Sequence, residues 1–177
     1  MNEERDQRLV DACLKGDTKA FEEIVVSYQK PLYTAAYRIV EDQDEAEDVL
    51  QNAFIKAYEN LKSYKKSHKL FSWLYRITLN EALNTLHGKR RFEGLSGDYQ
   101  SGEKTGDEVV QESELSHALD SALRELKLDY RLVIILNHFH DRSYTEMSYI
   151  LNIPVKTVKS RLFTARNMLR ELLVHNK

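Results

Sequence analysis

Apolar residues recur at helical spacing along most of the chain, and the clearest instance lies near its C-terminal end. Met147, Ile150 and Leu151 fall on one side of a helix that we expect to begin near Ser143. Ser143 and Glu146 form a capping-box pattern, in which both side chains accept hydrogen bonds from backbone amides at a helix start. The pattern therefore predicts a short amphipathic helix.

A second helix is expected after a tight turn. Asn152 tolerates the backbone of such a turn, and Pro154 has the φ angle that the first turn of a helix requires. At about 100° per residue, the side that must face a core holds Val155, Val158, Leu162, Ala165 and Leu169. The opposite side holds Lys156, Ser160, Phe163, Thr164 and Asn167, and is flanked by Lys159 and Arg161.

Two short helices joined in this way form a helix-turn-helix, which places its second helix in the major groove of DNA. Phe163 is the unusual member, because a large apolar side chain on a basic surface suits contact with a thymine methyl group. An ordinary helical hairpin remains an alternative, in which the basic residues are only solvated and Phe163 packs on another helix.

The first 92 residues also read as helices. An apolar face around Leu9 and Cys13 ends at Gly16, and Asp17 or Thr18 is expected to cap the next helix. Pro31 is expected to bend or break that helix.

Residues 41–48 hold six carboxylates, which either cap a following helix or form a solvated acidic turn. That helix, 46–58, carries an apolar stripe and a polar edge that could hold a partner: Val49, Leu50, Ala53, Phe54, Ala57 and Tyr58 on the stripe, and Asp48, Gln51 and Asn52 on the edge.

Residues 62–92 interleave cations with aromatic side chains. The cations are Lys62, Lys65, Lys66, Lys69, Arg76, Lys89, Arg90 and Arg91. The aromatic residues are Tyr64, Phe71, Trp73, Tyr75 and Phe92. Single-stranded nucleic acid is bound by such surfaces, since phosphates need counter-charge and unstacked bases need flat partners. We favour base contact for Tyr64, and core packing for Trp73, Leu74 and Ile77.

The composition fits an all-α protein of two small helical domains. Hydrophobic residues make up 42% and charged residues 31% of 177, with only 2 prolines and 6 glycines. Residues 93–114 are rich in Gly, Ser and Glu, which predicts a flexible acidic linker between domains 1–92 and 115–177.

The second domain is net basic, which suits a polyanionic partner. No apolar run reaches the length of a membrane span, and Cys13 is expected to be a small core residue in a cytoplasmic protein.

Three stretches, in this order, resemble the extracytoplasmic-function (group IV) class of bacterial sigma factors. They are DEAEDVLQNAFIKAY, then FSWLYRITLNEALNTL followed by KRR, and finally DYRLVI with SYTEMSYILNIPVKTVKSRL. The resemblance implies that 1–92 is sigma domain two, which binds core RNA polymerase and recognises and melts the minus-ten element. It implies that 115–177 is sigma domain four, which reads the minus-thirty-five element.

The resemblance also implies roles for single residues. Core-polymerase binding would fall to Asp48, Gln51 and Phe54. Minus-ten DNA binding would fall to Tyr64, Lys69, Trp73, Arg76, Asn80, Asn84, Arg90 and Arg91, with Tyr64 and Asn80 near an extruded base. Minus-thirty-five binding would fall to Lys156, Thr157, Lys159, Ser160, Arg161, Phe163, Thr164 and Arg166. Lys156 and Arg166 are expected to hold phosphates.

Several positions depart from the family pattern, with milder changes at Asn84 and His87. Lys156 and Thr164 stand where many members have Gly and Arg, and Asn137 and Asp141 stand where Arg and Gly are frequent. An arginine can bind guanine with two hydrogen bonds, so its absence at Thr164 changes the expected base preference. The resemblance therefore does not extend to the promoter sequence.

Two other classes of protein explain the sequence less completely. A stand-alone helix-turn-helix repressor or activator would explain 143–173, but it leaves the basic and aromatic stretch 62–92 without a role. An enzyme is not expected: His138, His140 and Asp141 lack the further ligands that a metal site needs. We expect no cofactor. The expected partners are core polymerase, promoter DNA and an anti-sigma factor, in a stress or envelope response.

Overall fold

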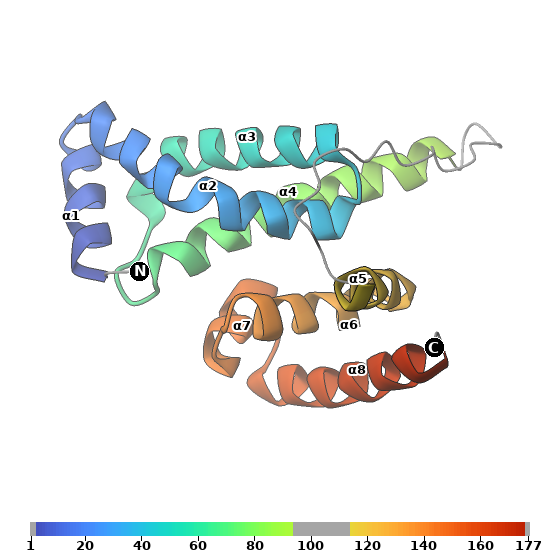
Figure 1. Ribbon diagram of the computed structural model, residues 1–177. Coiled ribbons are helices and arrows are strands. Elements are labelled where there is room, and N and C mark those ends of the chain that lie inside the picture. The colour runs from blue at the N-terminus through green and yellow to red at the C-terminus, as the bar shows by residue number, and fades with distance from the viewer. Residues whose placement is uncertain (1–2, 94–113, 176–177) are drawn as a thin grey trace. The chain divides into compact units, whose positions relative to one another are not determined.

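The computed structural model describes residues 3–93 and 114–175, and every regular element in these two ranges is helical (Figure 1). The chain divides into two compact units, one built mainly from residues 1–91 and the other mainly from residues 92–177, and each unit is described by itself. The predicted linker lies outside the described residues except for its two ends, Glu93 and Glu114, which belong to helices. None of the helices in the described ranges is both long and apolar enough to cross a membrane.

The N-terminal unit is built from four α-helices and one short 3₁₀ turn. These are α1 (Glu3–Leu14), α2 (Thr18–Val40), α3 (Gln43–Glu59), η1 (Leu61–Ser63) and α4 (Leu70–Glu93). Helix α2 packs against both α1 and α3. Ile24, Tyr28 and Leu32 lie on its buried side. Burial of Trp73 and Leu74 agrees with the core packing that we favoured for them, whereas Ile77 is only half-buried.

Short polar side chains set the helix boundaries of this unit. Asp17 caps α2 by accepting hydrogen bonds from the amides of Lys19 and Ala20, and Asp42 caps α3 by accepting one from Glu45. Part of the acidic run therefore caps a helix, because carboxylates are favourable where backbone amides lack partners. Pro31 does not end α2, since the buried side of the helix continues to pack on both sides of it.

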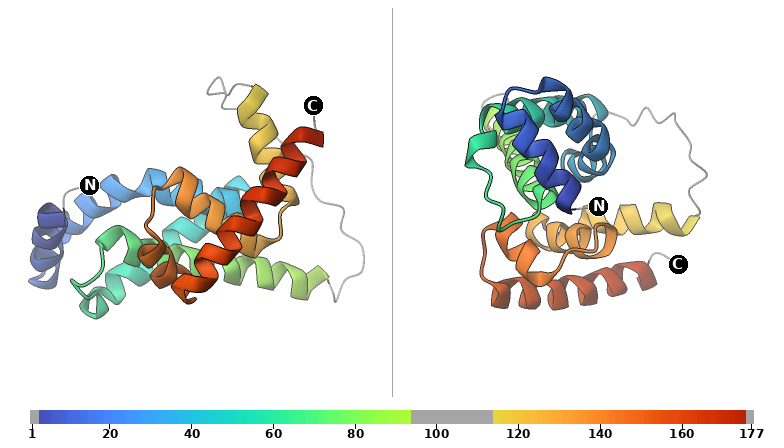
Figure 2. Two further views of the ribbon diagram at one scale, coloured as in Figure 1. Left: turned by 90° about the horizontal axis from the view of Figure 1, so that it is seen from below. Right: turned by 90° about the vertical axis from the view of Figure 1, so that its left-hand side faces the viewer.

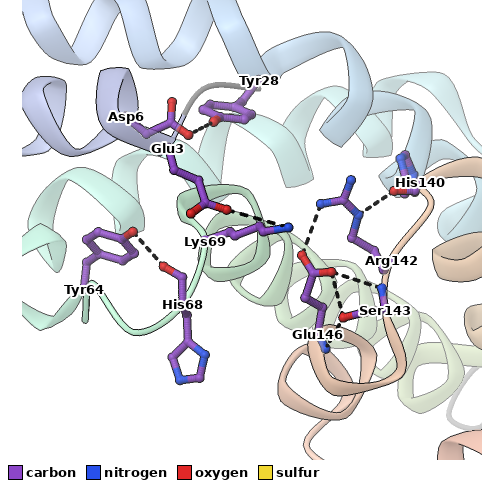
Figure 3. Close-up of polar contacts among 10 residues, drawn as sticks. All are labelled: Glu3, Asp6, Tyr28, Tyr64, His68, Lys69, His140, Arg142, Ser143 and Glu146. Carbon is purple, nitrogen blue, oxygen red and sulfur yellow. Dashed lines mark hydrogen bonds and ion pairs between the residues drawn. The ribbon is translucent and has the colours of Figure 1, made fainter.

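One buried carboxylate joins α1 to α2. The Tyr28 hydroxyl donates a hydrogen bond to Asp6, and both side chains are buried (Figure 3). Burial raises the pKa of Tyr28 far above its usual range, and the bond to Asp6 raises it further. The folded state therefore favours the neutral phenol.

This contact predicts a loss of stability at alkaline pH. The unfolded phenol titrates near pH 10, so the stabilisation from the raised pKa is complete below that pH and declines above it. Tyr28→Phe should lower the free energy of unfolding by about 1–3 kcal/mol at neutral pH, because Asp6 loses its donor. The difference in unfolding free energy between wild type and this variant should become smaller above pH 10, as measured by urea unfolding from pH 7 to 11. A constant difference across that range would contradict the assignment.

The C-terminal unit contains four α-helices and one π-helical turn. These are α5 (Glu114–Glu125), α6 (Leu128–Ile134), η2 (Ile135–Phe139), α7 (Tyr144–Leu151) and α8 (Val155–His175). Helix α8 runs alongside α6 and also contacts α5 (Figure 2). Its buried side holds Val158, Leu162 and Ala165, as the apolar spacing predicted.

The predicted capping box is present at the start of α7. The Ser143 amide donates to Glu146 Oε2 at 3.0 Å, and the Glu146 amide donates to Ser143 Oγ at 3.2 Å (Figure 3). Asn152 has a φ angle of 53°, which makes the tight turn before α8 as its residue type predicted. The two helices of the predicted helix-turn-helix are therefore both formed.

Ser143→Ala should lower the free energy of unfolding by about 1 kcal/mol, because an orphan amide loses its acceptor. Ser143→Thr keeps a hydroxyl and should recover most of the loss. Urea unfolding followed by circular dichroism measures both variants. Equal stability of the alanine variant and wild type would show that the cap contributes nothing.

Candidate polymerase and nucleic-acid interfaces

An apolar groove of about 540 Å³ lies between α2 and α3. Its lining is mostly hydrophobic, with polar residues among it: Phe21, Val25, Gln29, Glu47, Leu50, Gln51, Phe54, Ile55, Tyr58 and Glu59. The Phe21 ring contacts the rings of Phe54 and Tyr58 edge-on, at centroid distances of 6.4 and 4.9 Å. Such a groove suits an apolar surface of a protein partner.

The structure brings two of the three predicted polymerase-binding residues to this groove. Gln51 and Phe54 line it, whereas Asp48 is exposed on α3 and is not part of the lining. The sequence analysis did not predict Ile55, which is 50% exposed and also lines the groove. Its apolar side chain among polar neighbours on the helix could have indicated a binding surface. Tyr58 was assigned to the apolar stripe, but half of its surface is exposed.

Tyr64 follows η1 and is half-buried. Its hydroxyl donates to the His68 carbonyl oxygen at 2.7 Å (Figure 3), and its ring lies 5.5 Å from that of Trp73. Burial raises the pKa of Tyr64, and the nearby Asp6 carboxylate raises it further. Trp73 is only 7% exposed, which favours support of Tyr64 over direct base contact.

The other candidate minus-ten residues in the described range follow one face of α4. Arg76, Asn80 and Asn84 recur at spacings of four, which places them on one side of a helix, and Lys69 precedes it. Asn80, Asn84 and Lys69 are exposed and Arg76 is half-buried. The side chains of Arg90 and Arg91 lie outside the described residues.

Several cations of this region pair with carboxylates. Lys66 lies 2.9 Å from Asp11, Lys69 lies 3.7 Å from Glu3, and Lys89 lies 2.7 Å from Glu45. Surface pairs of this kind contribute little to stability and are screened by salt. The lysines can therefore exchange these carboxylates for phosphates at low cost.

Helix α8 presents Phe163 to solvent, with 70% of its surface exposed. Lys156, Lys159 and Ser160 are exposed near it, while the opposite side of the helix is buried. This exposure contradicts the plain-hairpin alternative, in which Phe163 packs on another helix.

The remaining candidates on α8 differ in their surroundings. Arg161 pairs with Asp129 of α6 at 2.7 Å, so its charge is already compensated. Thr157 and Thr164 are half-buried. Arg166 is exposed and donates to the Asn137 side chain. Arg170 was missed: it is exposed and lies two turns beyond Phe163 on the same face.

Within the described residues, no group of three or more His, Cys, Asp or Glu side chains is placed to hold a metal ion. Arg142 donates to the His140 carbonyl oxygen, and its guanidinium also reaches Glu146 (Figure 3). Asp141 has a φ angle of 51°, a backbone conformation that glycine adopts most readily. The segment around His140 therefore serves as the entry to α7.

Two family models match this chain. Sigma-70 region 2 matches residues 24–92, and Sigma-70 region 4 matches residues 116–169. The RNA polymerase sigma-H factor of Pseudomonas aeruginosa is 31% identical over 98% of this chain and 96% of its own length. The ECF RNA polymerase sigma factor SigW of Bacillus subtilis is 36% identical over 90% of this chain and 91% of its own length.

Solved structures agree with these matches. The sigma factor RpoE of Bartonella quintana, in complex with the anti-sigma factor NepR, has a TM-score of 0.77 and 27% identity over 90% of this chain and 99% of its own. CnrH, in complex with the cytosolic domain of CnrY, has a TM-score of 0.75 and 25% identity over 98% of this chain and 99% of its own.

The chain belongs to the extracytoplasmic-function sigma factors of RNA polymerase. Sigma factors are DNA-binding regulators of transcription. A stand-alone helix-turn-helix repressor is not favoured, because the matches cover both units and not only the helix-turn-helix.

Proposed function

We propose that this protein brings core RNA polymerase to a set of promoters through three surfaces. The apolar groove between α2 and α3 binds the polymerase, the polar face of α4 binds the melted minus-ten strand, and the exposed face of α8 reads the minus-thirty-five duplex. The observation that carries the proposal is the exposed Phe163 among cations on the second helix of a helix-turn-helix, in a chain that matches sigma factors over both units.

For the polymerase surface, we infer that Gln51 and Phe54 contact the partner, with Asp48 at the margin. Support comes from Ile55 and Tyr58, the exposed side chains of the lining that would be covered on binding; Phe54 lines the groove but is only 9% exposed. Burial of such groups is the main favourable term in protein association. Acidic residues on the lining, Glu47 and Glu59, favour a partner with basic side chains beside its apolar ones.

For the minus-ten strand, we infer that Tyr64 and Asn80 lie near an extruded base and that Lys69, Arg76 and Asn84 follow the backbone. Base extrusion costs a few kcal/mol and must be offset by stacking and hydrogen bonds. Asn80 is exposed and can offer both donors and acceptors to a base edge. Arg90 and Arg91 are proposed to add phosphate contacts.

For the minus-thirty-five duplex, we infer that Lys159, Ser160, Phe163 and Thr164 face base edges and that Lys156 and Arg166 hold phosphates. The exposure of Lys156, Lys159 and Phe163 supports these roles. Arg161, Thr157 and Thr164 have weaker support, since Arg161 pairs with Asp129 and both threonines are half-buried.

We propose that an anti-sigma factor covers these surfaces in the cytoplasm until a signal releases them. The two structural neighbours, RpoE and CnrH, were each solved with a protein bound. Polymerase binding should therefore be weaker in a lysate of the source cells than after purification. Equal binding in both, with no co-purifying inhibitor, would remove this part of the proposal.

Binding of the polymerase can be tested with the purified full-length chain and core polymerase. We expect the two to co-elute in gel filtration as a one-to-one complex, and the complex to retain promoter fragments that core polymerase alone does not. Promoter retention by the chain alone, without co-elution with polymerase, would favour a repressor.

A further inference from the structure

Two exposed cations of α8 are each held by a neutral side chain from another element of the same unit. Arg166 Nη2 donates to Asn137 Oδ1 at 2.7 Å, and Asn137 lies in the π-helical turn η2. The Lys159 ammonium lies 5.7 Å from the centroid of the Tyr144 ring, at the start of α7. Lys159 and Arg166 are seven positions apart, so they lie on the same edge of α8.

The partner of Arg161 differs in kind. Arg161 pairs with the carboxylate of Asp129, which compensates its positive charge. An amide oxygen and an aromatic ring carry no net charge, so Arg166 and Lys159 keep theirs in full. The two cations on the exposed edge are therefore held by uncharged partners, whereas Arg161, on the side of α8 towards α6, has a carboxylate partner.

We propose that Asn137 and Tyr144 are positioning residues for promoter recognition: Asn137 holds Arg166 for contact with a phosphate, and Tyr144 holds Lys159 for contact with the base edges beside it. The proposal rests on the proposed role of α8. Arg166 uses one of its five N–H groups on Asn137 and keeps four for phosphate oxygens. The Tyr144 ring attracts the Lys159 ammonium while leaving its donors available. Ordering both side chains before binding reduces the entropy lost on binding.

Asn137→Asp separates positioning from plain structural support. The substitution gives Arg166 a carboxylate partner, which should strengthen the contact while it compensates the charge. We expect holoenzyme with this variant to bind its promoter fragment about two- to tenfold more weakly. The slope of log affinity against log salt concentration should fall by about 1, as expected when one phosphate contact is lost.

The control is Ser121→Asp, which adds the same charge at an exposed position of α5. It should change neither the affinity nor the salt slope. If Asn137→Asp also leaves both unchanged, or acts no differently from Ser121→Asp, Asn137 does not position Arg166 for DNA.

The role of Tyr144 is tested by two substitutions, one that keeps the aromatic ring and one that removes it. Tyr144→Phe keeps the ring and should bind promoter as wild type does, whereas Tyr144→Leu should bind about two- to tenfold more weakly. An equal loss in both would assign the effect to the hydroxyl and overturn the positioning role. If the wild-type holoenzyme initiates normally and no variant changes promoter binding, the positioning role is refuted and the proposed function stands. If the wild-type holoenzyme initiates on no fragment, both the positioning role and the proposed function are refuted.

Discussion

Phe163→Ala should weaken binding of the holoenzyme to its minus-thirty-five duplex by about 5- to 150-fold, corresponding to about 1–3 kcal/mol. Phe163 is 70% exposed and lies among cations, so its ring can contact apolar base edges such as the thymine methyl group. The same exposure means that little packing is lost in the free protein. The free energy of unfolding should therefore change by no more than about 0.5 kcal/mol.

Affinity is measured by titrating labelled duplex with holoenzyme, and stability by urea unfolding of the free chain. Val174→Ala is the matched control, because Val174 is also an exposed apolar residue of α8, near its C-terminal end. It should change neither quantity. A loss of several kcal/mol of stability in Phe163→Ala would show instead that the ring packs in the core.

Ile55→Asp should weaken binding to core polymerase by about 30-fold or more, since buried central residues of an interface often contribute about 2 kcal/mol or more. Ile55 is half-exposed and lines the groove between α2 and α3. The substitution places a carboxylate in an apolar contact and beside the acidic side chains of Glu47 and Glu59. Promoter-dependent transcription should fall in parallel.

Val26→Asp provides the control for this change. Val26 is 69% exposed on α2 and is not part of the groove lining, so the same chemical change there should leave polymerase affinity intact. Both variants should fold, because neither side chain is buried. Equal polymerase affinity of Ile55→Asp and wild type would exclude the groove as the polymerase site.

Local sequence rules were enough to predict the helix-turn-helix. Ser143 with Glu146, and Asn152 with Pro154, act over a few residues, so their effect on the backbone follows from chemistry alone. The helical spacing of Val158 and Leu162 likewise fixed which side of α8 is buried, and placed Phe163 on the other side.

Features that depend on residues distant in sequence were not predicted. The groove needs α2 and α3 to pack together, and the apolar stripe of α3 alone does not tell Ala53, which is buried, from Tyr58, which is half-exposed. Pro31 was expected to bend or break α2, and it does not break it, because the helix is buried on both sides of the proline. Cys13 was expected in the core and is only half-buried.

The partners of the cations on α8 could not be predicted from the sequence either. Arg161 and Arg166 are both arginines of one basic helix, and only the structure separates the one paired with Asp129 from the one held by Asn137. Their partners lie about 30 positions away in the sequence. The Asn137 contact also depends on a π-helical turn, which no local sequence pattern predicted.

Run-off transcription is the most direct test of the proposed function. Purified core polymerase is incubated with a pool of promoter fragments, with and without this protein. We expect initiation at a distinct subset of fragments only when the protein is present, and the shared sequences of that subset then define its minus-ten and minus-thirty-five elements. Absence of initiation, together with tight duplex binding by the protein alone, would contradict a sigma factor and favour a repressor.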